Sequence, residues 1–106
     1  MPSQSQAGVY ASIAHYLKVL EASAGNSHDG AAIVAKMKAT PTDDPLFGKG
    51  YIREDGRKTH PAYLFEVKTL AESKYPWDYY KLIATIPAEE AFKPLSQSEC
   101  PLVKKP

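Results

Sequence analysis

Three histidines and one cysteine are among the side chains of this 106-residue chain that could bind a metal ion or act as a nucleophile. His15, His28 and His60 fall in three separate segments, without the short spacing at which two ligands share one metal ion. We expect His15 to lie in solvent on the polar side of a helix and His60 to make a structural hydrogen bond. The histidines therefore predict no metal site.

The cysteine and the acidic residues offer no better catalytic set. Cys100 has no basic neighbour that would favour its thiolate. As the only cysteine, it is a free thiol, half of an intermolecular bridge, or the partner of a cysteine outside this chain. Glu89 and Glu90 are adjacent, so on a helix they would point in different directions and would not act as an acid–base pair. We expect neither an enzyme nor a bound cofactor.

Four of the six residues from 75 to 80 are aromatic (Tyr-Pro-Trp-Asp-Tyr-Tyr). Such a cluster can stack on nucleic-acid bases or on an aromatic ligand. Basic residues are sparse around it, and the formal net charge of the chain is only +1, which provides no broad field for a nucleic acid. Packing against another segment is the favoured interpretation, and we expect no nucleic-acid partner.

Two helices are predicted in the first 40 residues. The first is expected over 7–24, and its buried face consists of apolar residues at helical spacing, namely Val9, Ile13, Leu17 and Leu20. A second, shorter helix is expected over 29–38, with Ser27 or Asp29 as its N-cap. Because the connection between them is short, the two helices should form a helical hairpin.

Strands and loops are predicted after the helices. Residues 40–48 have the composition of a loop. A short strand over 50–53, a turn over 54–57 and a return strand over 62–68 predict a β-hairpin.

The last third of the chain begins with a polar segment, 70–78, which suggests a crossing or hinge. Residues 79–86 then predict a further strand that is apolar on both faces and therefore needs cover on both sides. A short helix follows over 88–92, and the tail over 96–106 is too polar and proline-rich to fold without support. Together these elements predict an α+β fold.

An ordered series of short stretches runs along nearly the whole chain. It comprises Gln6-Ala7-Gly8-Val9-Tyr10, His15-Tyr16-Leu17-Lys18, Ala35-Lys36-Met37, Gly50-Tyr51-Ile52-Arg53-Glu54-Asp55-Gly56-Arg57, His60, Tyr63-Leu64, Val67-Lys68, Pro76-Trp77-Asp78-Tyr79-Tyr80-Lys81, Ala84-Thr85-Ile86-Pro87, Glu90-Ala91-Phe92, Pro94-Leu95 and Cys100-Pro101-Leu102-Val103. In order and spacing the series resembles the C-terminal part of a periplasmic solute-binding protein of the branched-chain amino acid (Leu/Ile/Val-binding) ABC transporter type.

The resemblance implies a partial, non-catalytic segment of a receptor whose two α/β lobes hold a solute between them. Residues 1–74 would be the remnant of the first lobe, with the helix pair and the β-hairpin, and residues 75–106 the crossing strand and C-terminal tail. The hinge residues would be Tyr75, Trp77, Asp78 and Tyr79. The implied partners are an amino acid or an aromatic or other organic acid, and the membrane permease of the transporter.

Gly8 and Tyr10 are the ligand-contact candidates that the resemblance implies. Some family members place an aromatic side chain against the solute near the start of the first helix, where this chain has Gly8. The glycine would leave room for a bulkier solute such as an aromatic acid, or would only let the chain approach a neighbouring element, and both interpretations stay open. Any ligand contact depends on lobes outside this chain. The resemblance also implies that a disulfide partner of Cys100 lies outside this chain.

The resemblance implies a periplasmic location for the full-length parent. Residues 1–6 lack the positive and apolar stretches of a signal peptide, so the chain as written is expected to stay in the cytoplasm. The resemblance places the central sheet of the first lobe outside this chain, so the apolar faces of the helices and strands would be uncovered. We therefore expect a homo-oligomer, in which the partial lobe is completed by association with another copy or by strand or tail exchange. The alternative function is a stand-alone small interaction domain in which the same scaffold serves oligomerisation.

Overall fold

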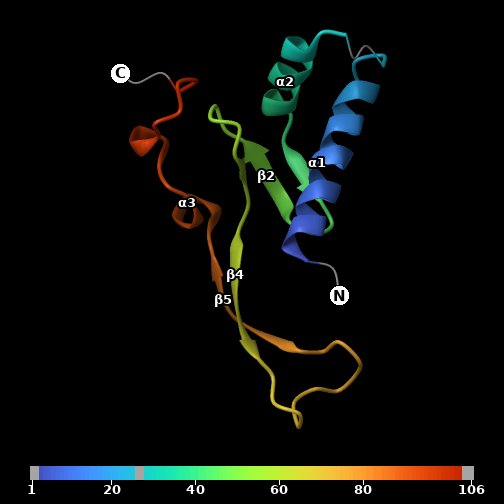
Figure 1. Cartoon of the computed structure of the whole chain (residues 1–106), viewed down its shortest axis with the longest axis vertical. Helices are drawn as coiled ribbons and strands as arrows, with labels where there is room; N and C mark the ends of the chain where they lie inside the picture. Colours follow the sequence, from blue (N-terminus) through green and yellow to red (C-terminus); the bar gives the residue numbers. More distant parts are fainter. Residues whose placement is uncertain (1–2, 26–27, 104–106) are drawn as a thin grey trace.

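The computed structural model describes residues 3–25 and 28–103. Its order of elements is α1 (Gln4–Glu21), α2 (Gly30–Ala39), β1 (Thr42–Asp44), β2 (Gly48–Ile52), β3 (Lys58–Thr59), β4 (Ala62–Val67), β5 (Tyr80–Ile86), α3 (Ala88–Ala91) and a 3-10 turn at Leu95–Gln97. The helices and the first three strands lie together at one end, and a long ribbon made of β4 and β5 extends away from them (Figure 1). The predicted α+β fold is confirmed.

Helix α1 begins three residues earlier than predicted because a capping box fixes its start. The backbone N–H of Gln6 donates to the Ser3 hydroxyl at 3.3 Å, and the backbone N–H of Ser3 donates to the Gln6 side-chain oxygen at 2.7 Å. The helix ends at Glu21, and Gly25 follows in the left-handed conformation with φ +73°. Ser27, one of the two N-caps predicted for the next helix, lies outside the described residues.

Helix α2 packs against α1 and completes the predicted helical hairpin. Its N-cap is Asp29, whose carboxylate accepts a hydrogen bond from the backbone N–H of Ala32 at 2.9 Å. The ammonium of Lys36 reaches back to the end of the first helix, where it donates to the Ala22 carbonyl at 2.5 Å and to the Ser23 hydroxyl at 3.0 Å. These bonds hold α2 against the end of α1.

The face of α1 that packs within this chain differs from the predicted one. Its buried residues are Ala11, His15 and Val19, whereas the predicted stripe is mostly exposed, at 61% for Val9, 53% for Ile13 and 54% for Leu17. His15 is only 8% exposed, and its Nε2 lies 3.0 Å from the Met37 carbonyl at the end of α2, so the prediction of a solvated His15 is wrong. This hydrogen bond satisfies a polar ring atom that burial would otherwise penalise.

The strand pairing also differs from the prediction. Strand β2 lies between β1 and β3 and is antiparallel to both, with Thr42 opposite Gly50 and Tyr51 opposite Thr59. The segment 40–48, predicted as a loop, therefore contains a strand. Strand β4 pairs with β5 and not with β2, because Pro61 has no N–H to donate and separates β3 from β4.

Few apolar residues are buried in this chain. Among the described residues, the buried hydrophobic ones are Ala11, Val19 and Ile33, and every residue of β5 is exposed. The radius of gyration is 17.3 Å, whereas a compact domain of this length has about 13 Å. No helix in the described part of the chain has the length and apolarity to cross a bilayer. The apolar faces of α1 and of the β4–β5 ribbon are thus left uncovered.

Candidate functional site

A groove of about 840 Å³ lies beside the N-terminal half of α1. Its other walls come from the turn after β1 and from the run that leads into β4. The lining residues are Ser3, Gln4, Gln6, Ala7, Tyr10, Leu46, Phe47, His60, Pro61, Ala62, Tyr63 and Phe65. Such a volume and a mainly apolar lining with a few polar groups are typical of small-molecule sites.

His60 is the central ring of an aromatic stack at this groove. Its ring centroid lies 4.4 Å from that of Phe47 and 5.5 Å from that of Phe92. Its Nδ1 lies 2.8 Å from the Pro61 carbonyl, which can only accept, so Nδ1 carries the hydrogen. The predicted structural hydrogen bond of His60 is confirmed, and it fixes the ring as part of the wall.

Tyr10 lines the groove, and Gly8 lies two residues earlier on the same helix. A Cβ atom built on Gly8 would meet no described atom within 4 Å. Within the described chain, therefore, no neighbouring element approaches Gly8 closely enough to require a glycine. The carbonyl of Gly8 accepts a hydrogen bond from the Ser12 hydroxyl at 2.7 Å, which is an ordinary contact inside a helix.

The four predicted hinge residues lie together in the loop that joins β4 to β5, at the end of the ribbon away from α2 (Figure 1). Asp78 is 7% exposed and is bound twice: the Lys68 ammonium donates to one oxygen at 2.6 Å, and the backbone N–H of Lys74 donates to the other at 3.1 Å. We call these contacts the Asp78 clasp. The clasp closes a loop in which most of the other residues are exposed.

Trp77 occupies the left-handed region inside this loop, with φ +74°, a conformation that bulky side chains rarely adopt. Its ring packs edge-on against Tyr79, with centroids 5.9 Å apart. The backbone N–H of Tyr79 also donates to the Trp77 carbonyl at 2.9 Å. Strain of this kind persists only where surrounding contacts impose it, and the Asp78 clasp is that contact here.

The hydrogen bond from Lys68 lowers the pKa of Asp78 and raises that of Lys68. A carboxyl whose pKa is lower in the folded state stabilises that state above its unfolded pKa of about 3.9 and loses this contribution as the pH falls through its folded value. The loop should therefore keep its order from neutral pH down to about pH 4 and lose it below.

An Asp78→Asn variant should disorder the loop at neutral pH, because it leaves the Lys68 ammonium without its anionic partner. Trp77 is the only tryptophan, so its fluorescence reports on the loop directly. We expect the variant to have a shifted emission maximum at pH 7 and to lack the acid transition of the parent. Glu66→Gln is the control, since Glu66 forms only an exposed pair with Lys81 at 3.8 Å. An unchanged emission profile in Asp78→Asn would contradict the role of the clasp.

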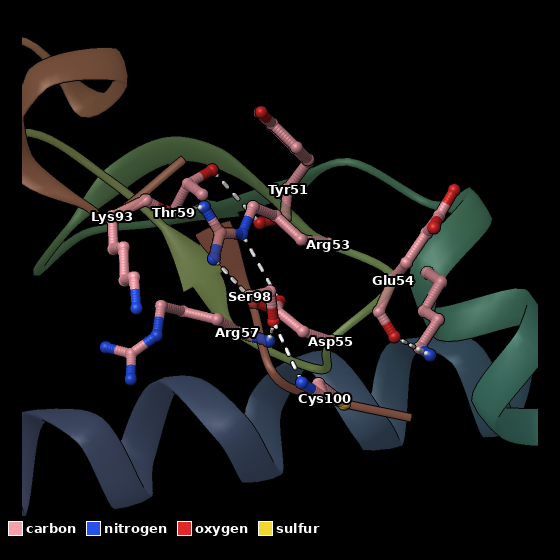
Figure 2. A network of polar contacts seen from close by, with 10 residues as sticks. Tyr51, Arg53, Glu54, Asp55, Arg57, Thr59, Lys93, Ser98 and Cys100 are labelled. Carbon is pink, nitrogen blue, oxygen red and sulfur yellow. Dashed lines mark hydrogen bonds and ion pairs between the residues drawn. The ribbon is translucent and has the colours of Figure 1, made fainter. Parts of the chain in front are cut away.

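A second polar network joins the residues that follow α3 to the turn between β2 and β3 (Figure 2). The guanidinium of Arg53 pairs with Asp55 at 2.5 Å and donates to the Lys93 carbonyl at 2.8 Å. Arg57 lies 5.7 Å from the ring of Phe92. Sequence reasoning predicted this turn over 54–57 but did not anticipate that its charged side chains contact the residues that follow α3.

Cys100 lies near this network, and it lines a shallow hollow together with Arg57 and Ser98. It is half-buried and free, and its backbone N–H donates to the Ser98 hydroxyl at 3.2 Å (Figure 2). Within residues 3–25 and 28–103, no three His, Cys, Asp or Glu side chains come together as metal ligands would. The hollow of the groove, and not a catalytic cluster, is the feature of these residues that suits a ligand.

Comparison with known proteins matches the chain to one family. The family profile described as "Periplasmic binding protein" matches residues 1–74. A periplasmic binding protein from Burkholderia mallei, known from its crystal structure, is 47% identical, with a TM-score of 0.88 over 98% of this chain and 27% of its own. A branched chain amino acid ABC transporter periplasmic ligand-binding protein from Burkholderia xenovorans LB400 is 38% identical, with the same TM-score and coverage.

No curated protein matches the chain. The chain spans about a quarter of the length of the two solved relatives, and nearly all of it superposes on that quarter. With the profile covering residues 1–74 and both structures covering the rest as well, the chain belongs to the periplasmic binding protein family, of which it carries a segment.

Proposed function

We propose that this chain is the C-terminal segment of the extracytoplasmic substrate-binding component of an ABC transporter for amino acids or related small organic acids. The observation that carries the proposal is the superposition of 98% of the chain on only 27% of a periplasmic binding protein. The second relative, described as belonging to a branched-chain amino acid transporter, supports the solute class and a membrane permease as partner. The parent would work in the periplasm.

The groove supports an incomplete solute site. It is open to solvent, and Tyr10, which lines it, is about half exposed. We assign Gly8 and Tyr10 to solute contact only when the remaining lobes are present. The segment alone is therefore not competent to hold a ligand.

The loop that contains the Asp78 clasp supports a hinge role for Tyr75, Trp77, Asp78 and Tyr79. It lies at the end of a ribbon that leaves the helices, as a connection between two lobes would (Figure 1). In this proposal, residues 1–74 belong to the first lobe, and residues 75–106 form the crossing strand and the tail. The clasp would keep the hinge at one geometry.

In isolation the segment is proposed to form homo-oligomers, because its uncovered faces are apolar. The exposed stripe of α1 and the two faces of the β4–β5 ribbon provide the contact surface. Exchange of the ribbon or tail between subunits is one arrangement that would cover them. The same exposure favours a second candidate function, a small interaction domain that assembles through this surface.

The experiment that tests the proposed function is thermal unfolding in the presence of a panel of amino acids and small organic acids. It compares this chain with a two-lobed receptor in which the chain replaces the matching 27% of the Burkholderia mallei protein. A ligand at 100 times its Kd stabilises a folded protein by about 2.7 kcal/mol, so binding raises the melting temperature. Only the two-lobed receptor should respond. A chain that binds a solute tightly by itself, or a folded receptor that responds to none, would contradict the proposal.

A further inference from the structure

The β4–β5 ribbon is joined to the rest of the molecule mainly at its base, where the chain enters β4 and leaves β5. Its two strands form a sheet of their own, with Ala62 opposite Ile86 at that base. In the described chain, no hydrogen bond or ion pair joins residues 62–86 to residues 3–25 or 29–59. The direction in which the ribbon extends therefore depends on how its two ends are held.

Arg53, in the turn between β2 and β3, holds the chain where it has left β5 and α3 (Figure 2). Asp55 orients its guanidinium by accepting hydrogen bonds from Nε at 3.2 Å and from Nη2 at 2.5 Å. The remaining nitrogen, Nη1, donates to the Lys93 carbonyl at 2.8 Å, two residues beyond α3. A planar guanidinium can bind both acceptors in fixed directions, which the single ammonium of a lysine cannot do.

Phe92 is a second anchor, beside the hydrogen bond from Arg53. Its ring lies edge-on to that of His60, with centroids 5.5 Å apart and an angle of 85° between the planes. The guanidinium carbon of Arg57 lies 5.7 Å from the centre of the same ring. Because His60 lies just before β4 and Phe92 just after α3, this contact joins the two ends of the ribbon directly.

We infer that residues 92–100 form a C-terminal strap that fixes the direction of the ribbon, and that Arg53 is the residue that positions this strap. With the strap closed, the ribbon is held at both of its ends. With the strap open, it is held only through the connection at Pro61 and can pivot there. Because the loop that contains the Asp78 clasp lies at the far end of the ribbon, the strap sets where that loop lies relative to the helices (Figure 1). All of these contacts lie within this chain, so the inference does not depend on the proposed function.

Pulsed electron–electron distance measurements between two spin labels test the strap. Lys18→Cys on α1 and Lys74→Cys in the far loop carry the labels, because both residues are exposed, and Cys100→Ser removes the native thiol. Dilution with unlabelled chain keeps distances between copies out of the signal. The parent should give one narrow distribution of distances, and Arg53→Gln should lose it. Loss of a hydrogen bond from a charged donor should shift the strap toward the open state by at least about tenfold.

Lys49→Gln is the matched control, because it removes one positive charge from an exposed position of β2. It should keep the narrow distribution, and circular dichroism should show equal secondary structure in Arg53→Gln and Lys49→Gln. A folded Arg53→Gln that keeps the narrow distribution overturns the inference. A parent or control whose distribution is as broad as that of Arg53→Gln also overturns it.

Phe92→Ala decides the question should Arg53→Gln fail to fold. It removes the ring contacts of the strap and leaves the pair between Arg53 and Asp55 untouched. A broad distribution in Phe92→Ala, with secondary structure equal to that of the parent, supports the strap. A narrow distribution like that of the parent overturns it.

Discussion

Replacing Gly50 with alanine is expected to destabilise the β1–β2–β3 sheet by at least about 1–3 kcal/mol, the range for overpacking a tight site. A Cβ atom at this position would lie 2.0 Å from the Thr59 backbone oxygen and 3.2 Å from the Thr42 hydroxyl. The first contact is with backbone in a paired strand, so it cannot be relieved by a side-chain rotation. Strand β3 would have to move away from β2, and their pairing would be lost.

Gly8→Ala is the control for this substitution, because it makes the same chemical change in open space. No described atom lies within 4 Å of the added methyl group, and alanine is favoured over glycine inside a helix by about 1 kcal/mol. Denaturant unfolding followed by circular dichroism, at one fixed protein concentration, should show opposite signs for the two variants. Equal stability of Gly50→Ala and the parent chain would show that β3 does not hold this position.

If the chain forms the proposed homo-oligomer, the double variant Ile13→Asp, Leu17→Asp is expected to convert it into a monomer. Both side chains are about half exposed, so the change removes little packing inside the chain but places two charges on the apolar stripe of α1. Burying two such side chains in an interface contributes about 3–6 kcal/mol, so the dissociation constant should rise at least about hundredfold. Sedimentation velocity at micromolar concentration measures the change.

Lys18→Asp is the matched control for the double variant. It lies on an exposed position of the same helix outside the stripe, and it changes the net charge by the same two units. It should leave the association state unchanged, and circular dichroism should confirm equal helix content in both variants. A parent chain that sediments as a monomer, or a control that dissociates equally, would show that the stripe is not the contact surface.

The helices and the family could be predicted from the sequence because both depend on local or ordered features. Helical spacing and capping residues placed α1 and α2 within three residues of their observed starts. The ordered short stretches pointed to the periplasmic binding proteins, and the family match confirms this resemblance. Because the family is non-catalytic, the match also confirms the prediction of a non-catalytic protein.

The strand partners could not be predicted, because alternation of side chains identifies a strand without identifying its neighbour. The run 62–68 was predicted as the return strand of a hairpin with 50–53, but the observed partner of β4 is β5. Strand β1 has only three residues, too few for an alternating pattern to be visible in the sequence.

His15 was misplaced for a different reason. Hydrophobic periodicity finds the most apolar face of a helix, and in α1 that face is exposed within this chain. The opposite face packs on α2 with two small apolar side chains and a histidine whose ring nitrogen is hydrogen-bonded. The groove was missed as a site because its walls come from three distant segments of the chain, although Tyr10 had been singled out.

The β4–β5 ribbon has a consequence for handling the isolated chain. Within the described residues, β4 and β5 pair only with each other. Each strand therefore has an outer row of backbone N–H and C=O groups that is open to strand addition. Such rows template cross-β growth, and the residues on both faces are largely apolar, which would favour stacking of the resulting sheets. Lysine or proline placed along the outer row of β5 should therefore slow fibril formation.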